Sequence, residues 1–452
     1  MSHAPRSTAG PAPDAVRPHD AAAPLACDIF CAVIDNFGDI GVCWRLARQL
    51  AREHGWEVRL FVDDLHAFEK LCPTLDASRA SQMVEGVVVE HWHETDHVGE
   101  TLRIADVVIE AFACELPSAY VAAMAERTPT PVWLNLEYLS AEDWVADFHL
   151  RPSPHPRYGL LKHFFFPGLG AGTGGVLKER DLDAARAAFE SSPDAREAWW
   201  QRATGGPPPG PEATVISLFA YENPAIDTLL EQWRDNPTPV VLLAPQGRIS
   251  GALARFFGVP SFGAGARGER GSLTAHSLAF TDQRGYDALL WASDLNFVRG
   301  EDSFVRAQWA ARPFVWHIYP QADDAHLPKL DAALEHYTRT LDAAPREALE
   351  RFWHAWNGNT GHAAGAHDGG ASGTIAAADN ATPETAPETA PEIAPGTAQK
   401  APDRAPDRVP DWADLARHLP ALKARAHGWA AELALTGDLA GNLAEFAKTQ
   451  LK

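Results

Sequence analysis

Short apolar runs alternate with amphipathic stretches in two successive series, and this alternation constrains the fold more than any other feature of the sequence. Apolar runs of this length indicate buried parallel strands, and apolar residues at helical spacing indicate the helices between them. In the first series we expect helices at 42–53 and 116–126, and strands at 29–34, 58–62, 87–89, 107–109 and 132–136. This order predicts a doubly wound sheet.

The second series begins near residue 213 and repeats the pattern. We expect its strands at 214–219, 239–244, 273–280, 295–298 and 314–316. The helices are expected at 225–234, 285–292, 304–311 and 327–341. The chain is therefore predicted to hold two tandem α/β domains of similar construction.

At 452 residues the chain is too long for one ordinary core, which favours two domains with additional segments. We place the domains at 27–190 and 191–357, and expect the aromatic, proline-rich and glycine-rich stretch 147–175 to be a long loop or an interdomain wall. Residues 1–26 are interpreted as a disordered leader and 358–408, with Ala-Pro-Glu-Thr repeats, as a disordered insertion. Residues 409–452 are expected to be helical.

Charge and composition exclude several classes of protein. The net charge is −21, from 39 basic and 60 acidic residues, which argues against a general nucleic-acid binder. No apolar stretch approaches the roughly 18 residues of a membrane-spanning helix, so no membrane partner is expected. The five cysteines form no paired metal-binding pattern and suggest reduced thiols in a cytoplasmic protein. The 19 histidines are scattered, and no metal site is predicted.

An acidic, glycine-containing loop follows the first predicted strand. It reads Asp-Asn-Phe-Gly-Asp-Ile-Gly over residues 35–41 and leads into the first helix. Ligands in open α/β sheets gather at the carboxyl ends of strands, so Asp35 and Asp39 are candidate catalytic carboxylates. The alternative is that Asp35 opens a turn and Asp39 only caps the helix.

A second loop of the same kind lies at residues 299–303, where a short strand ends at Arg299. Gly300 permits a tight turn, and Asp302 or Ser303 is expected to cap the following helix. The amides of that helix start, together with the Arg299 guanidinium, suit a diphosphate without a metal ion. Ordinary capping, with Arg299 paired to an acidic neighbour, would use the same atoms and remains the alternative.

Other polar and aromatic residues end strands of the second domain. Phe280 could stack on a nucleobase while Gln283 bonds to its edge, although an aromatic side chain at a strand end is more often part of the core or rim. Residues 219–224 close another strand, and the polar loop 319–326 follows the last one.

Taken together, these segments resemble one family, the bacterial protein-arginine rhamnosyltransferases known as EarP, which modify translation elongation factor P. The resemblance covers roughly residues 27–345 and, more weakly, the C-terminal helices. It rests on six ordered motifs: DNFGDIGVCWR at 35–45, NLEYLS at 135–140, FFFPG at 164–168, SLFAYE at 217–222, RGEDSF at 299–304 and IYPQ at 318–321. The leader and the insertion depart from the family pattern.

The resemblance implies a GT-B fold, in which two Rossmann-like domains face each other across a cleft. It implies inverting transfer of rhamnose from dTDP-β-L-rhamnose to an arginine of elongation factor P, with no metal or other cofactor. The first domain would then be the acceptor side and the second the nucleotide-sugar side. By motif match, Asp39 would be the general base, and Asp35 and Glu301 would be further essential carboxylates. The donor-binding residues implied are Phe219, Tyr221, Phe280, Gln283, Arg299, Asp302 and Ser303.

Other functions remain compatible with the residues alone. One is a GT-B transferase with another nucleotide sugar and a small-molecule or glycan acceptor. Another is a noncatalytic nucleotide-binding protein. A nicotinamide-dependent enzyme is disfavoured, because neither loop contains the GxGxxG spacing.

Overall fold

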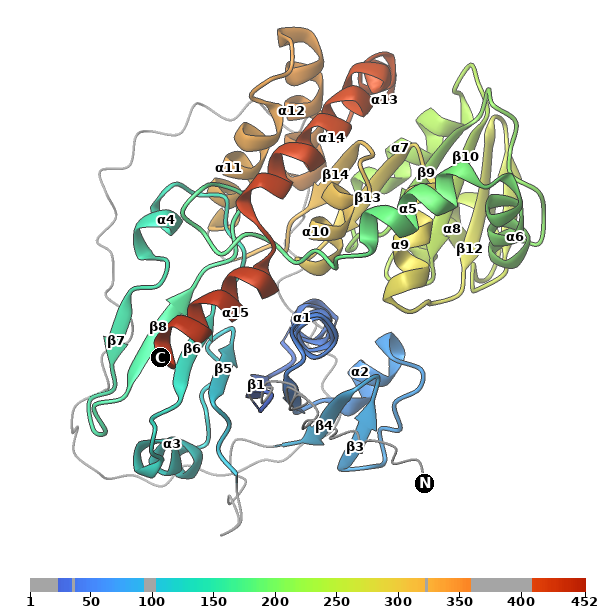
Figure 1. Cartoon of the computed structure of the whole chain (residues 1–452). Coiled ribbons are helices and arrows are strands. Elements are labelled where there is room, and N and C mark those ends of the chain that lie inside the picture. The colour runs from blue at the N-terminus through green and yellow to red at the C-terminus, as the bar shows by residue number, and fades with distance from the viewer. Residues whose placement is uncertain (1–22, 35–36, 93–102, 322–323, 359–408) are drawn as a thin grey trace, which may run out of the picture.

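The chain folds around two separate β-sheets, one in each half (Figure 1). The computed structural model describes residues 23–34, 37–92, 103–321, 324–358 and 409–452. Apart from residues 23–26 and 358, the predicted leader and insertion lie outside the described residues. The two tandem α/β units predicted from the alternation are confirmed.

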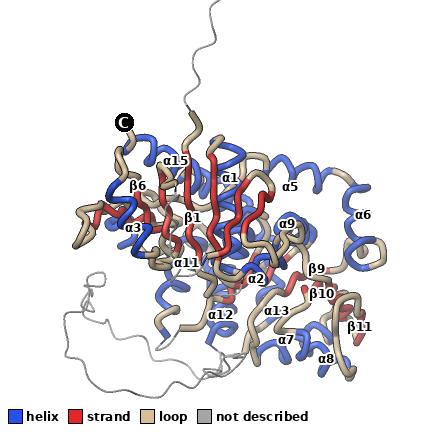
Figure 2. The backbone as a smooth tube through the Cα atoms, turned by 90° about the horizontal axis from the view of Figure 1, so that it is seen from below, coloured by secondary structure: helices blue, strands red, loops and turns tan. Residues whose placement is uncertain are grey.

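The first sheet has the order β3-β4-β2-β1-β5-β6-β8-β7. Its neighbours pair in parallel except the edge strands β3 and β7, which are antiparallel. Figure 2 shows these strands side by side, with β1 near the middle of the sheet. The strands are β1 (Ala26–Cys31), β2 (Glu57–Val62), β3 (Ser81–Val84), β4 (Val87–His91), β5 (Val107–Ala111), β6 (Val132–Leu136), β7 (Pro152–Pro154) and β8 (Leu161–Phe165).

The second sheet repeats this arrangement with the order β11-β12-β10-β9-β13-β14. Its first strand, β9, lies between β10 and β13, just as β1 lies between β2 and β5. Only its edge strand β11 is antiparallel. The strands are β9 (Thr214–Leu218), β10 (Val240–Pro245), β11 (Arg267–Arg270), β12 (Leu273–Leu278), β13 (Leu295–Arg299) and β14 (Phe314–His317).

Helices cover both faces of each sheet. Those associated with the first half are α1 (Gly38–His54), α2 (Leu65–Leu71), α3 (Ser118–Glu126) and α4 (Trp144–Phe148). Next come α5 (Leu182–Ser191) and α6 (Pro193–Thr204), of which α5 packs against α9 of the second half. The second half adds α7 (Ala225–Arg234), α8 (Ser250–Phe257), α9 (Gln283–Ala292), α10 (Asp302–Trp309), α11 (Leu327–Thr338) and α12 (Ala343–Gly358).

The first strand ends earlier than the apolar run predicts. β1 stops at Cys31, whereas the prediction extended it to Ile34. The Val33 amide donates to the Asp63 carboxylate (2.9 Å) and the Ile34 amide to the Asp39 carboxylate (2.9 Å). Because these amides bond to side chains, the chain leaves the sheet three residues early, and Ile34 is 75% exposed.

The aromatic stretch 147–175 is only partly loop, which corrects the prediction. Residues 161–165 form β8, which pairs in parallel with β6, and residues 152–154 add the edge strand β7. The free edge of β6 gives this segment hydrogen-bond partners, and such pairing overrides weak local strand propensity.

The C-terminal segment, expected to be helical, contains α13 (Trp412–Arg417), α14 (Leu419–Leu433) and α15 (Leu439–Gln450). α13 packs against α12, and Arg351 of α12 donates to Asp414 of α13 (2.9 Å). α14 contributes Trp429 and Leu433 to the core of the second half. α15 returns to the first half, where Leu439 and Leu443 join its core and the helix packs against α1.

The start of α15 is fixed by a close backbone contact at Gly175. This residue has φ +73°, and a Cβ there would lie 2.5 Å from the Gly437 carbonyl oxygen. We expect Gly175→Ala to lower the free energy of unfolding by about 2–3 kcal/mol, from left-handed strain plus displacement of that carbonyl. Urea denaturation measures the loss.

Gly55→Ala is the matched control, because Gly55 has φ +69° with nothing within 4 Å of the added Cβ. It should lose only the strain component, about 1 kcal/mol. Equal losses in the two variants would show that the contact with Gly437 contributes nothing to stability.

In the part of the chain that the structure describes, no helix is both long enough and apolar enough to cross a membrane.

Candidate active site

A cleft lies between the two halves. The first half supplies Phe37, Gly38 and Leu71, and the rest of the wall comes from loops at the carboxyl ends of strands in the second sheet. Ligand sites of open α/β sheets occupy this edge. All the donor-binding residues implied by the resemblance line the cleft, together with Glu301: Phe219, Tyr221, Phe280, Gln283, Arg299, Asp302 and Ser303.

Asp39 lies in the first turn of α1, beside the cleft-lining residue Gly38. Its carboxylate accepts the Ile34 amide and lies within hydrogen-bonding reach of the Tyr138 hydroxyl. Phe37, not Asp39, occupies the N-cap position, so the alternative in which Asp39 only caps the helix is wrong. Asp39 is 2% exposed. Asp35 lies outside the described residues.

Glu301, in the second loop, interacts with Asp39 of the first loop. It precedes α10, and its carboxylate accepts the Leu139 amide from the first half (3.0 Å). The pKa of Glu301 is raised to about 8, mainly by burial and in part by the negative charge of Asp39, while the Leu139 hydrogen bond and Lys329 oppose the rise. The carboxylates of the two loops therefore act on each other across the boundary between the halves.

The raised pKa of Glu301 predicts a pH-dependent stability. Between the ordinary value of 4.5 and the folded value of about 8, the folded state holds a proton that the unfolded state has lost. The stabilisation from this group is complete below pH 4.5 and disappears as the pH rises towards 8. Glutamine at this position cannot titrate. The Tm of Glu301→Gln minus the Tm of the unaltered protein should therefore increase as the pH rises from 4.5 to 8.

Thermal unfolding at a series of pH values checks this, with Glu212→Gln on an exposed loop as control. A Tm difference for Glu301→Gln that does not vary with pH would contradict the assigned pKa.

Arg299, the last residue of β13, forms the side of the cleft opposite the first half. Its guanidinium lies over two aromatic rings, 4.5 Å from the centroid of Phe219 and 4.7 Å from that of Tyr221. Stacking of this kind fixes the plane of a guanidinium, whose N–H groups form a planar fork. The group is therefore suited to a bidentate contact with an anion such as a diphosphate.

The loop between β13 and α10 is a tight turn around Gly300, which has φ +62°. The predicted N-cap is wrong: α10 begins at Asp302, Glu301 precedes it, and no side chain caps it. Because the helix starts two residues early, Ser303 lies inside its first turn. The Ser303 hydroxyl donates to the Arg299 carbonyl and accepts the Arg299 amide, which ties the turn together.

Two other residues predicted to bind the donor also hold the halves together. Asp302 accepts the Arg45 Nε of α1 (2.7 Å). The Gln283 amide nitrogen donates to the Gly41 carbonyl (2.9 Å) and Asp302 (3.3 Å), while its oxygen accepts from Arg48 (2.6 Å). Their side chains line the cleft but are engaged by α1.

Behind the cleft, Arg45 belongs to a buried charge cluster that sequence reasoning missed. Arg45 contacts Glu179, Asp287 and Asp302, and Arg306 of α10 contacts Glu179 and Asp287. Burial disfavours the charged form of Arg45, but the three carboxylates outweigh it and raise the pKa. Four of the five pairs join residues 127 or more positions apart in the sequence, so only motif membership of Arg45 hinted at them.

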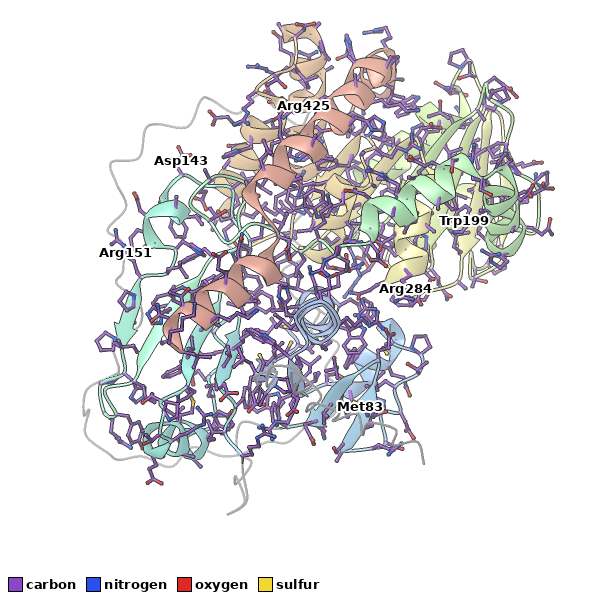
Figure 3. The ribbon with its side chains drawn as sticks, viewed as in Figure 1. Met83, Asp143, Arg151, Trp199, Arg284 and Arg425 are labelled. Atoms are coloured by element: carbon purple, nitrogen blue, oxygen red, sulfur yellow. The ribbon has the colours of Figure 1, made fainter. Side chains whose placement is uncertain are left out.

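Phe280 also reaches the first half. It is 38% exposed at the cleft, and its ring centroid lies 5.0 Å from that of Phe37. Arg284, one turn further on at the start of α9, lies on the side of the second half that faces the first (Figure 3).

The described residues contain no group of three or more histidine, cysteine, aspartate or glutamate side chains placed to hold a metal ion. Their five cysteines are free thiols.

Two Rossmann-like sheets facing a shared cleft, with the candidate substrate residues at their strand ends, define a glycosyltransferase of the GT-B fold. The model of the family described as Elongation-Factor P (EF-P) rhamnosyltransferase EarP matches residues 27–448. The chain therefore belongs to the EarP family.

Characterised relatives agree with this assignment. A protein-arginine rhamnosyltransferase of Pseudomonas putida is 52% identical over 330 residues, which cover 73% of this chain and 86% of the relative. One from Pseudomonas aeruginosa is 43% identical over 419 residues, or 93% and 98% of the two chains. A solved structure described as the structural basis for EarP-mediated arginine glycosylation of translation elongation factor EF-P is 31% identical, with a TM-score of 0.58. That match covers 94% of this chain and 99% of the other.

Proposed function

We propose that this protein transfers rhamnose from dTDP-β-L-rhamnose to an arginine side chain of elongation factor P, with inversion at the anomeric carbon. The observation that carries the proposal is the meeting of two loops at one cleft in an EarP-family chain. Asp39 and Glu301 act on each other there, beside the Arg299 side chain. Membership of the EarP family supports the rhamnosyl group and the protein acceptor.

The acceptor explains why a carboxylate is needed. An arginine guanidinium has a pKa above about 12 and delocalised lone pairs, so it is a poor nucleophile. Asp39 holds the planar group by charge-assisted hydrogen bonds and takes one proton as the nitrogen attacks. The new bond joins that nitrogen to the anomeric carbon of rhamnose, and the bond from this carbon to the diphosphate oxygen breaks.

The departing nucleotide leaves with the electron pair of the broken bond. In this proposal, that charge is stabilised by Arg299 and by the backbone amides at the start of α10, whose residues line the cleft. Fixed donors of this kind stabilise developing charge without reorganising. Phe219, Tyr221 and Phe280 provide aromatic surface for the nucleotide. Glu301, with its raised pKa, is protonated at neutral pH and can donate a hydrogen bond to the sugar.

Intact-mass analysis of elongation factor P tests the proposal. The factor, incubated with this protein and dTDP-rhamnose, should gain the mass of one rhamnosyl group. A factor whose acceptor arginine is replaced by lysine should gain nothing. Release of dTDP without a mass gain would favour a different acceptor, and a mass gain only with another nucleotide sugar would favour a different donor.

A further inference from the structure

The loop after β6, residues 137–140, touches both catalytic-loop carboxylates at once. The Tyr138 hydroxyl lies within hydrogen-bonding reach of the Asp39 carboxylate, and the amide of the next residue, Leu139, donates to Glu301 (3.0 Å). Adjacent residues of one loop thus contact a carboxylate from each half of the molecule. The NLEYLS motif that contains this loop has no role in the mechanism above.

The Tyr138 ring is held from one side by an aromatic stack. It lies against Phe112, with centroids 4.4 Å apart and ring planes 19° from parallel. Phe112 and Ala113 have positive φ angles of 56° and 53°, which non-glycine residues rarely adopt. Strained backbone of this kind persists where its surroundings enforce it, and it gathers at functional sites. The ring that stacks on Tyr138 thus belongs to a residue with strained backbone.

The ends of the loop are also fixed. Before it, the buried Asn135 side chain accepts the Ala113 amide (3.2 Å) and donates to Glu137 (2.5 Å). The Glu137 amide donates to the Phe165 carbonyl (3.0 Å), and the Ser140 amide donates to the Pro167 carbonyl (3.3 Å). These hydrogen bonds fix the backbone on both sides of Tyr138 and so hold its hydroxyl in place.

We propose that Tyr138 is a positioning residue that orients the Asp39 carboxylate for the acceptor guanidinium and favours its charged form by donating a hydrogen bond. The inference rests on the proposed function, in which Asp39 is the base.

The direction of the bond follows from the surroundings of the phenol. Burial raises the pKa of Tyr138, and the negative charge of Asp39 adds to the effect, so the hydroxyl keeps its proton and must donate. The titratable groups that interact with Asp39 include Cys31 of β1 and Cys43 of α1 as well as Tyr138 and Glu301.

Tyr138→Phe tests the role because it keeps the stack on Phe112 and removes only the hydroxyl. We expect kcat for rhamnosyl transfer to fall about tenfold at neutral pH. The acidic limb of the kcat profile should move to higher pH by about one unit, because the charged base loses a hydrogen bond. The dissociation constant for dTDP should stay unchanged, which also confirms that the variant is folded.

Tyr158→Phe is the matched control. Tyr158 is likewise stacked, on His155 with centroids 5.2 Å apart, and it does not line the cleft. This variant should keep the kcat and pH profile of the unaltered protein. An unmoved acidic limb in Tyr138→Phe, or a loss confined to dTDP affinity, would overturn the inference while leaving the proposed function intact. Absence of transfer by the unaltered protein would overturn both.

Discussion

Asp39→Asn is expected to abolish rhamnosyl transfer while leaving the affinity for dTDP nearly unchanged. Asparagine has almost the same shape and can still accept the Ile34 amide, so the loop should keep its conformation. It cannot take a proton from the attacking guanidinium. General-base catalysis contributes about 10²- to 10⁴-fold, and loss of the charge that holds the acceptor adds to the effect. Single-turnover assays by intact mass and calorimetric titration with dTDP measure the two quantities.

Arg299→Ala is the comparison for Asp39→Asn, because we expect it to lower the affinity for dTDP. It removes the guanidinium that lies over Phe219 and Tyr221 and should weaken dTDP binding by about tenfold or more, from the loss of charge-assisted hydrogen bonds. If Asp39→Asn transferred rhamnose at the unaltered rate, or lost dTDP affinity as Arg299→Ala does, Asp39 would not be the base.

Arg45→Met should produce the largest loss of stability. It leaves Glu179, Asp287 and Asp302 with fewer positive partners in a buried environment. Breaking a buried ion pair by removing one partner costs about 3–5 kcal/mol, because the remaining charge is uncompensated. Asp302 would also lose its tie to α1, so we expect weaker donor binding as well. Urea denaturation and dTDP titration measure both effects.

Arg103→Met is the control for Arg45→Met. Arg103 pairs with Glu57 on the surface, where the two side chains are 69% and 56% exposed. Its removal should change stability by no more than about 0.5 kcal/mol. A similarly small change for Arg45→Met would mean that the cluster gives no net stabilisation.

Apolar runs and helical spacing in the sequence were sufficient to predict most strands of the second half and the central strands of the first half. The segments 132–136 and 225–234 agree with β6 and α7 to the residue. Pro131 and Pro224 stand immediately before them, and proline marks a boundary because its φ is fixed and it lacks an amide donor. Strand β8 was missed because its sequence, Leu-Lys-His-Phe-Phe, contains no β-branched residue and forms only by pairing with β6.

The candidate site was predictable to the level of its two loops. The strand, loop and helix pattern marked Asp39 and Glu301, and the family resemblance supplied their roles. The sequence pattern could not show which side chains bind one another across the boundary between the two halves. Arg45 and Asp302 are 257 residues apart, and nothing local distinguishes Arg45 from Arg52, which is exposed on the same helix. The contact between Tyr138 and Asp39 could not be predicted either, because the two residues are far apart in the sequence.

The packing of α12 against α13 has a practical consequence. The chain leaves the second half after α12 and returns at α13, so the two ends of the intervening stretch are held close together whatever its length. Doubling such a loop costs only about 0.6 kcal/mol in closure entropy. This junction is therefore the place where a fluorescent reporter or an affinity module can be spliced into the enzyme, leaving the cleft and both sheets undisturbed.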